Sequence, residues 1–331
     1  VKLARLEEDA FAKDRMCQRI VKLSFYKAAV ALTGAKPPWG ALTGIRPARL
    51  VTQMLDAGQT ERQALRTMEQ EFFVAPERAA LCLDTARASR AASAALAPED
   101  ISLYVGIPFC PTRCAYCSFV SASVEKTFSM MDPYLDALAR EIALMGASVK
   151  RLGLRIKSVY LGGGTPTTLS AAQLARLLGT LERHFDLSHL AEYTVEAGRP
   201  DTITAEKLAV LRDHGVSRIS INPQTMENHV LRAIGRRHSE ADVYAAMELA
   251  KASGIPHINM DLIAGLPEDN AAGFRRTLDK CLALGPDNLT VHTLALKKGS
   301  RILLDGLTIP PAEEVAAMLD YAAAQLRSAH Y

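Results

Sequence analysis

Residues 101–117 read Ile101-Ser-Leu-Tyr-Val-Gly-Ile-Pro-Phe-Cys110-Pro-Thr-Arg-Cys114-Ala-Tyr-Cys117, which joins a short apolar segment to three cysteines spaced C-x3-C-x2-C. Three thiolates on one loop can hold three irons of a [4Fe-4S] cluster, and the fourth iron then stays open to a ligand. The alternative is a structural zinc loop, which normally needs a second cysteine pair or histidines downstream. Since no second pair follows here, the stretch predicts an iron–sulfur site on Cys110, Cys114 and Cys117.

The chain beyond this stretch alternates strand-like and helix-like segments. Short apolar strands are expected over 101–107, 158–161, 193–197, 218–221, 258–263 and 289–293. Helices are expected over 132–152, 170–184, 204–213, 226–235, 239–252, 270–284 and 311–328, the first two capped by Asp132 and Ser170. Six β/α units predict an α/β fold with a partial, TIM-like (β/α)6 barrel. Ligands bind such barrels at the carboxyl ends of the strands, where the cysteine loop lies.

Residues 1–98 have apolar residues at helical spacing and are predicted to form a helical accessory region, with the barrel over 99–331. Trp39 and Arg46 lie in a turn-rich stretch that we expect to pack between helices, with a binding loop as the alternative. The chain starts at Val1 and stops at Tyr331 in helical patterns. We therefore expect a fragment, truncated at its C-terminal end.

The composition is that of an ordinary globular enzyme, with 49% hydrophobic and 23% charged residues. A net charge of +3 gives no reason to expect nucleic acid as a partner, and no apolar run approaches the roughly 20 residues that span a bilayer. Six cysteines in 331 residues do not suggest a disulfide framework, so a cytoplasmic location is expected. Cys17, Cys82 and Cys281 are expected to be buried hydrophobic residues.

Further candidate residues are expected at the edge of the sheet that carries the cysteine loop. Gly162-Gly163-Gly164-Thr165-Pro166 follows the second strand and can present N–H groups to a ligand, although a tight turn also explains it. Glu196 ends the third strand, Gln224 follows the fourth and Asp261 lies in the fifth. Arg236 has a planar fork that suits a carboxylate. Other residues are expected to be solvated at a helix end (Arg237, His238) or structural (His257, His292).

These motifs resemble the radical S-adenosylmethionine superfamily. Within it, the sequence is similar to the oxygen-independent coproporphyrinogen III oxidases, and to their coproporphyrinogen dehydrogenase branch, through residues 38–47, 104–110, 162–166, 195–200, 221–224 and 261–267. The resemblance implies an oxidoreductase of haem biosynthesis that converts two propionates of coproporphyrinogen III to the vinyl groups of protoporphyrinogen IX with a 5′-deoxyadenosyl radical. It also implies a [4Fe-4S] cluster, S-adenosylmethionine, an electron donor such as flavodoxin or ferredoxin, and a monomer.

The resemblance assigns roles to individual positions. The three cysteines ligate the cluster, and the methionine end of the cofactor is contacted by Gly163, Gly164 and Thr165, with Glu196 at its polar groups. The remaining cofactor and substrate space is lined by Tyr104, Tyr116, Gln224, Arg236, Asp261 and Ala295. The residues implied in catalysis are Tyr104, Glu196, Gln224, Arg236 and Asp261.

Two positions depart from the founding oxidases, which have a histidine where this chain has Gly106 and a fourth cysteine where it has Phe119. Related haem chaperones also lack that cysteine. A haem-binding chaperone without oxidase activity is therefore one alternative, and another radical reaction on a tetrapyrrole is a second. The helical N-terminal region and the stretch 195–200 favour the oxidase.

Overall fold

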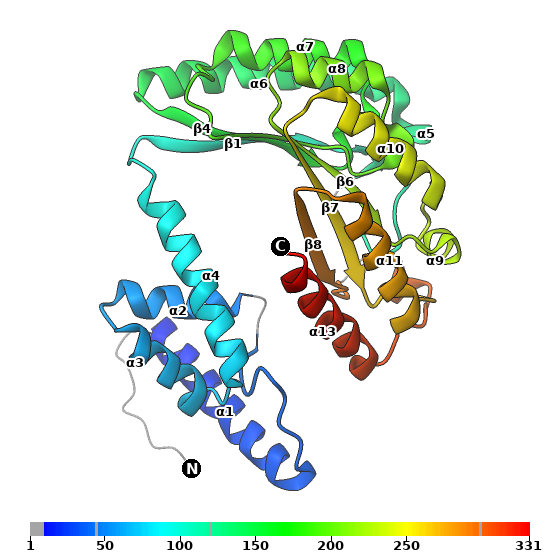
Figure 1. Ribbon diagram of the computed structural model, residues 1–331. Coiled ribbons are helices and arrows are strands. Elements are labelled where there is room, and N and C mark those ends of the chain that lie inside the picture. The colour runs from blue at the N-terminus through cyan, green and yellow to red at the C-terminus, as the bar shows by residue number, and fades with distance from the viewer. Residues whose placement is uncertain (1–9, 44–45, 120, 298–299) are drawn as a thin grey trace. The chain divides into compact units, whose positions relative to one another are not determined.

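The computed structural model describes residues 10–43, 46–119, 121–297 and 300–331. The chain divides into two compact units, Val1–Pro98 and Glu99–Tyr331, whose elements are labelled in Figure 1. Residues 1–9 of the expected first helix, and Gly44 and Ile45 of the turn-rich stretch, lie outside the described residues.

The N-terminal unit is helical, with α1 (Ala10–Thr33), α2 (Pro47–Asp56), α3 (Glu61–Arg66), a π-helical turn (Thr67–Glu71) and α4 (Pro76–Ala94). Proline is the first residue of α2 and of α4. At this position a backbone N–H has no acceptor within the helix, so a residue without an N–H costs no hydrogen bond. Trp39 packs against the buried cluster of this unit, as expected for a loop between helices, and a hollow of about 480 Å³ lies beside it. Arg46 is exposed at that hollow.

The second unit is built on a six-stranded sheet in the order β1-β4-β5-β6-β7-β8, in which every neighbouring pair is parallel. Its strands are β1 (Asp100–Ile107), β4 (Arg155–Gly163), β5 (Glu192–Glu196), β6 (Arg218–Gln224), β7 (His257–Ala264) and β8 (Asn288–Thr293). The strand directions rotate steadily from β1 to β8 (Figure 1). Because the strand order follows the chain, this is the open (β/α)6 barrel that the sequence predicts.

Six long helices cover the outer side of the sheet: α6 (Met131–Arg151), α7 (Ala171–His184), α8 (Ala205–Asp213), α10 (Glu240–Ser253), α11 (Ala271–Leu284) and α13 (Ala312–Ser328). Their apolar faces join the strand residues in one large core that includes Leu161, Ile219 and Met260. The predicted cap at Ser170 is confirmed, since its side chain accepts from the Gln173 N–H.

The predicted cap at Asp132 is wrong. The helix α6 begins at Met131, directly after the 3-10 turn Phe128–Met130, so the chain enters it without the break that a capping residue needs. Asp132 lies in the first helical turn, where its carboxylate accepts a hydrogen bond from Gln173 Nε2 at 2.8 Å.

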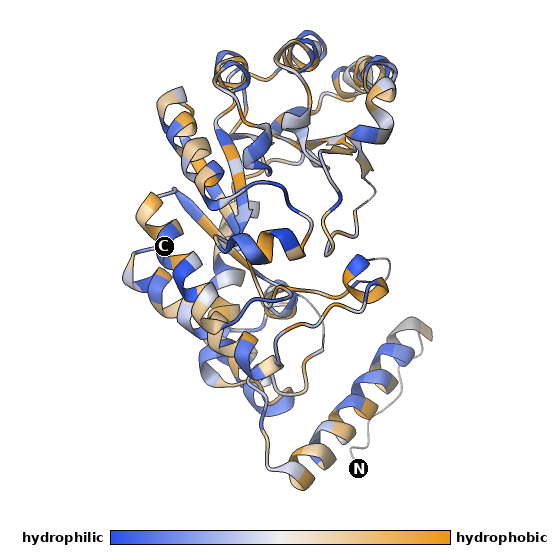
Figure 2. Ribbon diagram, turned by 90° about the vertical axis from the view of Figure 1, so that its right-hand side faces the viewer, coloured by the Kyte–Doolittle hydropathy of each residue, from blue (hydrophilic) through white to orange (hydrophobic). Residues whose placement is uncertain are grey.

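The helix predicted over 226–235 is present as the shorter α9 (Asn228–Ala233). Four short elements of the described residues are not predicted from the sequence: β2 (Phe109–Cys110), β3 (Ala122–Ser123), α5 (Val124–Thr127) and α12 (Arg301–Leu304). Figure 2 shows hydrophilic and hydrophobic residues intermixed along the helices. Throughout the described ranges, no helix has the length and apolarity needed to cross a membrane.

Candidate active site

The cysteine loop leaves the sheet at the carboxyl end of β1 and is closed by the parallel pair β2–β3, in which Cys110 lies opposite Ser123. Backbone hydrogen bonds fix it from two further sides: Ala115 N donates to Ile234 O at 3.0 Å, and Ile302 N donates to Ala115 O at 3.1 Å. Protein contacts alone therefore place the loop at the rim where the sequence predicts it.

The three thiols of the loop are free, with Cys114 buried and Cys110 and Cys117 partly exposed. Burial raises the pKa of Cys110, a hydrogen bond with Thr165 lowers it in part, and the charges of Cys114 and Cys117 raise it again. The thiols are therefore close enough to oppose one another's ionisation. A positively charged iron cluster bound by all three would remove this opposition.

The arrangement of these thiols fits a cluster better than a single metal ion. Within the described ranges, no three His, Cys, Asp or Glu side chains converge closely enough to hold one ion. A zinc site needs such convergence. A cubane does not, because each of its thiolates binds a different iron.

The glycine turn after β4 packs against the start of the cysteine loop. Gly164 N donates to Ile107 O at 2.8 Å, and Thr165 N donates to Phe109 O at 2.7 Å. These N–H groups are paired within the protein, whereas the sequence predicts that they face a ligand. The close approach is what requires glycine: a Cβ on Gly164 would lie 2.5 Å from Phe109 O, and Gly163 has a φ of +105°.

Polar side chains from successive strands share the space inside the sheet. Tyr160 on β4 donates a hydrogen bond to the carboxylate of Glu196 on β5. The ring of Tyr104 on β1 stacks on Tyr160 at a centroid distance of 5.9 Å. Burial raises the pKa of Glu196; the Tyr160 hydrogen bond lowers it in part, and the charge of Asp261 raises it. Glu196 is therefore easier to protonate than an ordinary glutamate.

The pKa of Asp261 on β7 is shifted in the opposite direction to that of Glu196. Burial acts to raise its pKa, but hydrogen bonds from His292, Asn259 and Thr290 outweigh burial, so the pKa is lowered. His292 Nε2 lies 3.8 Å from Asp261 Oδ2, and this contact raises the pKa of His292. His292 therefore lies at the edge of the candidate site, where it contacts Asp261, whereas the sequence predicts a purely structural role for it. Two neighbouring carboxylates with opposite pKa shifts are typical of acid–base assignments in enzymes.

Gln224 is the last residue of β6 and has a φ of +70°, which is uncommon for a residue other than glycine. Its side chain is buried, and no described residue hydrogen-bonds its Oε1; the same holds for Asn222 Oδ1. Buried polar atoms without partners are rare in proteins and commonly indicate a ligand or water. These two atoms therefore suit a polar ligand at the end of β6.

Arg236 is buried, and its guanidinium group donates hydrogen bonds mainly to other groups of the protein. Nη1 donates to Gly198 O at 3.2 Å and to Asn222 O, and Nη2 donates to Tyr116 OH at 3.0 Å. Within the described part of the chain, its Nε has no acceptor. Arg236 thus fixes Tyr116, the residue before the third cysteine, and leaves one donor for a ligand.

Three other positions singled out from the sequence lie nearer the surface. Ala295 is exposed in the segment after β8, and Phe119 is 67% exposed at the end of the cysteine loop. Gly106 on β1 has room for a side chain, since an added Cβ would meet only Tyr104 Cε1 at 3.6 Å. Packing therefore does not require glycine at position 106.

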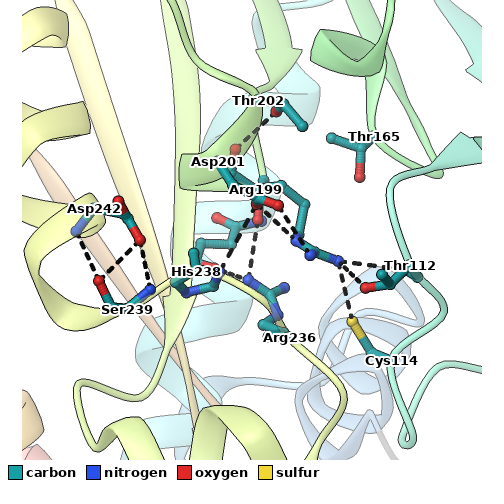
Figure 3. Close-up of polar contacts among 12 residues, drawn as sticks. Thr112, Cys114, Thr165, Arg199, Asp201, Thr202, Arg236, His238, Ser239 and Asp242 are labelled. Atoms are coloured by element: carbon teal, nitrogen blue, oxygen red, sulfur yellow. Dashed lines mark hydrogen bonds and ion pairs between the residues drawn. The ribbon is translucent and has the colours of Figure 1, made fainter.

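Arg199 is a site residue that the sequence pattern does not identify (Figure 3). It is only 2% exposed, and its Nη1 lies 3.9 Å from Cys114 Sγ and 3.0 Å from Thr112 Oγ1. Its Nε pairs with Asp201 at 3.1 Å. Two features of the sequence point to it: it lies three residues after the strand that ends at Glu196, and it belongs to the stretch 195–200 that carries the family resemblance. Arg199 brings a buried positive charge to a thiol of the predicted cluster.

His238 lies in the same buried network (Figure 3), so the prediction that it is solvated is wrong. Burial, with the charges of Arg236 and Arg199, lowers its pKa to about 3, so the imidazole is neutral at physiological pH. Arg237, which precedes it, is exposed as predicted and pairs with Glu125. Arg237 and His238 differ in exposure because the chain turns inward at His238 before α10 begins.

Residues 104–281 match the Radical SAM superfamily, and the chain belongs to it. The matched stretch contains the cysteine loop, the glycine turn, Glu196 and Asp261. Members of this superfamily use a [4Fe-4S] cluster with S-adenosylmethionine, which are therefore the cofactors of this chain. The cysteine spacing predicts the cluster, and the family resemblance implies S-adenosylmethionine.

Three known proteins resemble the chain over long stretches. The oxygen-independent coproporphyrinogen-III oxidase-like protein HemZ of Bacillus subtilis is 37% identical over 98% of this chain. The heme chaperone HemW of the same organism is 34% identical over 66%. The solved structure of coproporphyrinogen III oxidase (HemN) from Escherichia coli, a radical SAM enzyme, is 30% identical over 73% of the chain with a TM-score of 0.64. The chain spans 65%, 58% and 56% of the lengths of these proteins, respectively.

Proposed function

We propose that the protein is an oxygen-independent coproporphyrinogen III oxidase, which decarboxylates two propionates of its substrate to vinyl groups in haem biosynthesis. The observation that carries this proposal is the extent of the similarity to the oxidase-like protein HemZ, which covers 98% of the chain and thus both units. The match to the heme chaperone HemW covers 66%. The reduced thiols of the cysteine loop suit the cytoplasm as the compartment.

In this proposal Cys110, Cys114 and Cys117 would ligate the cluster. Gly163, Gly164 and Thr165 would line the methionine end of S-adenosylmethionine. When bound, the two cofactors supply a 5′-deoxyadenosyl radical that takes a hydrogen atom from the substrate. The protein's own task is to bind and orient the substrate and to exclude water from the site.

The carboxyl groups of Asp261 and Glu196 would contribute to substrate binding in different ways, because their pKa values are shifted in opposite directions. Asp261, whose pKa is lowered, favours the ionised form, which could accept hydrogen bonds from hydroxyl or ammonium groups of a ligand. Glu196, whose pKa is raised by burial, accepts a hydrogen bond from Tyr160 and is more readily protonated than an ordinary glutamate. The exposed ring of Tyr104, Gln224 Oε1, Arg236 Nε and the Ala295 segment would bound the remaining space for cofactor and substrate.

An anaerobic assay tests this function. The cluster is reconstituted in the protein, S-adenosylmethionine, dithionite and coproporphyrinogen III are added, and products are separated by chromatography. We expect 5′-deoxyadenosine together with a product that has lost two carboxyl groups. Cofactor cleavage with no decarboxylated product would contradict the proposed oxidase activity and point to another reaction on a tetrapyrrole.

The second candidate is a haem-binding chaperone. It is favoured by Gly106 and Phe119, which replace a histidine and a cysteine of the founding oxidases, and by the similarity to HemW. Haem titration of the same preparation separates the candidates, because a chaperone would bind haem tightly and yield no vinyl product.

Arg199→Met is expected to lower the reduction potential of the cluster by about 50 to 100 mV, because a buried positive charge close to a cluster thiolate favours the reduced state. Arg199→Lys keeps the charge and is expected to restore most of the potential. The measurement is a redox titration followed by electron paramagnetic resonance. Equal potentials in the wild type and the Arg199→Met variant would show that the arginine has only a structural role.

A further inference from the structure

A hollow of about 550 Å³ beside the cysteine loop is lined mainly by arginines, namely Arg113, Arg232, Arg236, Arg237 and Arg301. Four of these arginines are exposed, and Arg236 is buried. They come from three separate parts of the sequence: the cysteine loop, the segment around the end of α9, and α12. The fold therefore gathers them at one place on the surface, which we call the arginine surface.

The arginine surface carries an excess of positive charge. Arg237 is paired with Glu125 at 2.6 Å, and Arg301 with Asp305 at 2.8 Å. In the described part of the chain, Arg113 and Arg232 have no ion-pair partner. Glu125 is the one acid among the lining residues. Since the whole chain has a net charge of only +3, this local excess is not a general property of the protein.

The arginine surface adjoins the cysteine loop directly. Thr112 and Arg113 line it and lie between Cys110 and Cys114 in the sequence. Thr112 Oγ1 donates to Gly235 O at 2.9 Å, which ties the loop to the wall formed by residues 235–237. The same Thr112 accepts from Arg199, the residue in contact with Cys114 Sγ. The arginine surface is thus a solvent-exposed wall of the predicted cluster site.

We propose that the arginine surface is the docking site for an acidic electron-transfer protein that reduces the cluster. The proposal rests on the proposed radical function, which consumes one electron for each cofactor cleaved. The partner is a small protein with a flavin or an iron–sulfur centre and a surface rich in Asp and Glu. One electron passes from the reduced partner to the oxidised cluster, and no bond is made or broken.

Physical principles favour such a partner over a tightly bound one. Exposed charges at a rim accelerate encounter and set orientation more than they add affinity, which suits a donor that must dissociate after each transfer. Electron-transfer interfaces are accordingly small. The expected signature is an electron-transfer rate that falls as ionic strength rises.

The test uses Arg232→Glu/Arg301→Glu, which reverses two exposed charges and keeps every residue of the cysteine loop, together with Arg199 and Arg236, as in the wild type. The control is Lys150→Glu/Arg151→Glu, the same change in net charge at the exposed C-terminal end of α6. This end leads into the start of β4, whereas the cysteine loop follows the carboxyl end of β1. Each protein is given either reduced flavodoxin or dithionite. Cluster reduction is followed by stopped-flow absorbance, and 5′-deoxyadenosine is quantified.

We expect the Arg232→Glu/Arg301→Glu variant to lose at least about tenfold in the rate of cluster reduction by flavodoxin at low salt, and to match the wild type with dithionite. The control variant should match the wild type with both reductants. If flavodoxin reduces the cluster of the variant at the wild-type rate, the proposal is overturned. Equal loss with both reductants also overturns it, because the arginines would then act on the cluster itself. If the wild type fails with dithionite, the proposed function fails as well.

Discussion

Cys114→Ser is expected to abolish the iron–sulfur cluster and to reduce S-adenosylmethionine cleavage by at least about 1,000-fold, because a serine hydroxyl does not replace a thiolate as an iron ligand. Cys114 is the buried member of the three, in contact with Arg199 Nη1. Its loss would leave two ligands on one loop. The measurements are iron and sulfide content, visible absorbance and the yield of 5′-deoxyadenosine.

The control for this prediction is Cys17→Ser, in the N-terminal unit. Cys82 and Cys281 are buried as predicted, but the prediction that Cys17 is buried is wrong, since this cysteine is exposed. This variant should keep the iron content and cleavage rate of the wild type. A Cys114→Ser protein that still binds about four irons and cleaves the cofactor would contradict the ligand assignment.

Gly164→Ala is expected to cost about 2 to 4 kcal/mol of unfolding free energy and to lower the iron content of the reconstituted protein. The added Cβ would lie 2.5 Å from Phe109 O and 2.8 Å from Ile107 O. Both are backbone atoms of β1 and the cysteine loop, so they can retreat only by moving the loop itself. Denaturant unfolding gives the free energy.

Gly106→Ala is the matched control, since its Cβ would meet only a ring carbon of Tyr104 at 3.6 Å. We expect the stability of this variant to lie within about 1 kcal/mol of the wild type. If the two variants unfold at the same denaturant concentration, the close backbone contact at Gly164 does not determine the position of the loop.

Much of the barrel is predictable from the sequence because each long element has a periodic pattern. The six strands lie within three residues of their predicted ends, and the main helices follow the expected order. The short pair β2–β3 is not predictable, since two-residue strands carry no period. The cap at Asp132 also fails, because a preceding 3-10 turn continues into the helix.

Some residues of the candidate site can likewise be recognised from the sequence, and others cannot. The cysteine spacing, the glycine turn and the acids at strand ends can be recognised in the sequence because each lies close to a strand end. Arg199, His292 and the buried His238 cannot be, because their roles depend on neighbours far away in the chain. Arg199 meets Cys114 across 85 positions, and His292 meets Asp261 across 31.

By itself, the sequence determined the class of the fold and predicted the three thiol ligands, because strand and helix periods and the C-x3-C-x2-C spacing are local properties. Only the tertiary structure decided which charges surround those ligands. Parallel strands bring their carboxyl ends to one edge, so burial and proximity there separate the pKa values of Glu196 and Asp261 and place Arg199 beside Cys114. The same folding gathers arginines from three segments on the outer wall of the loop, which no local pattern predicts.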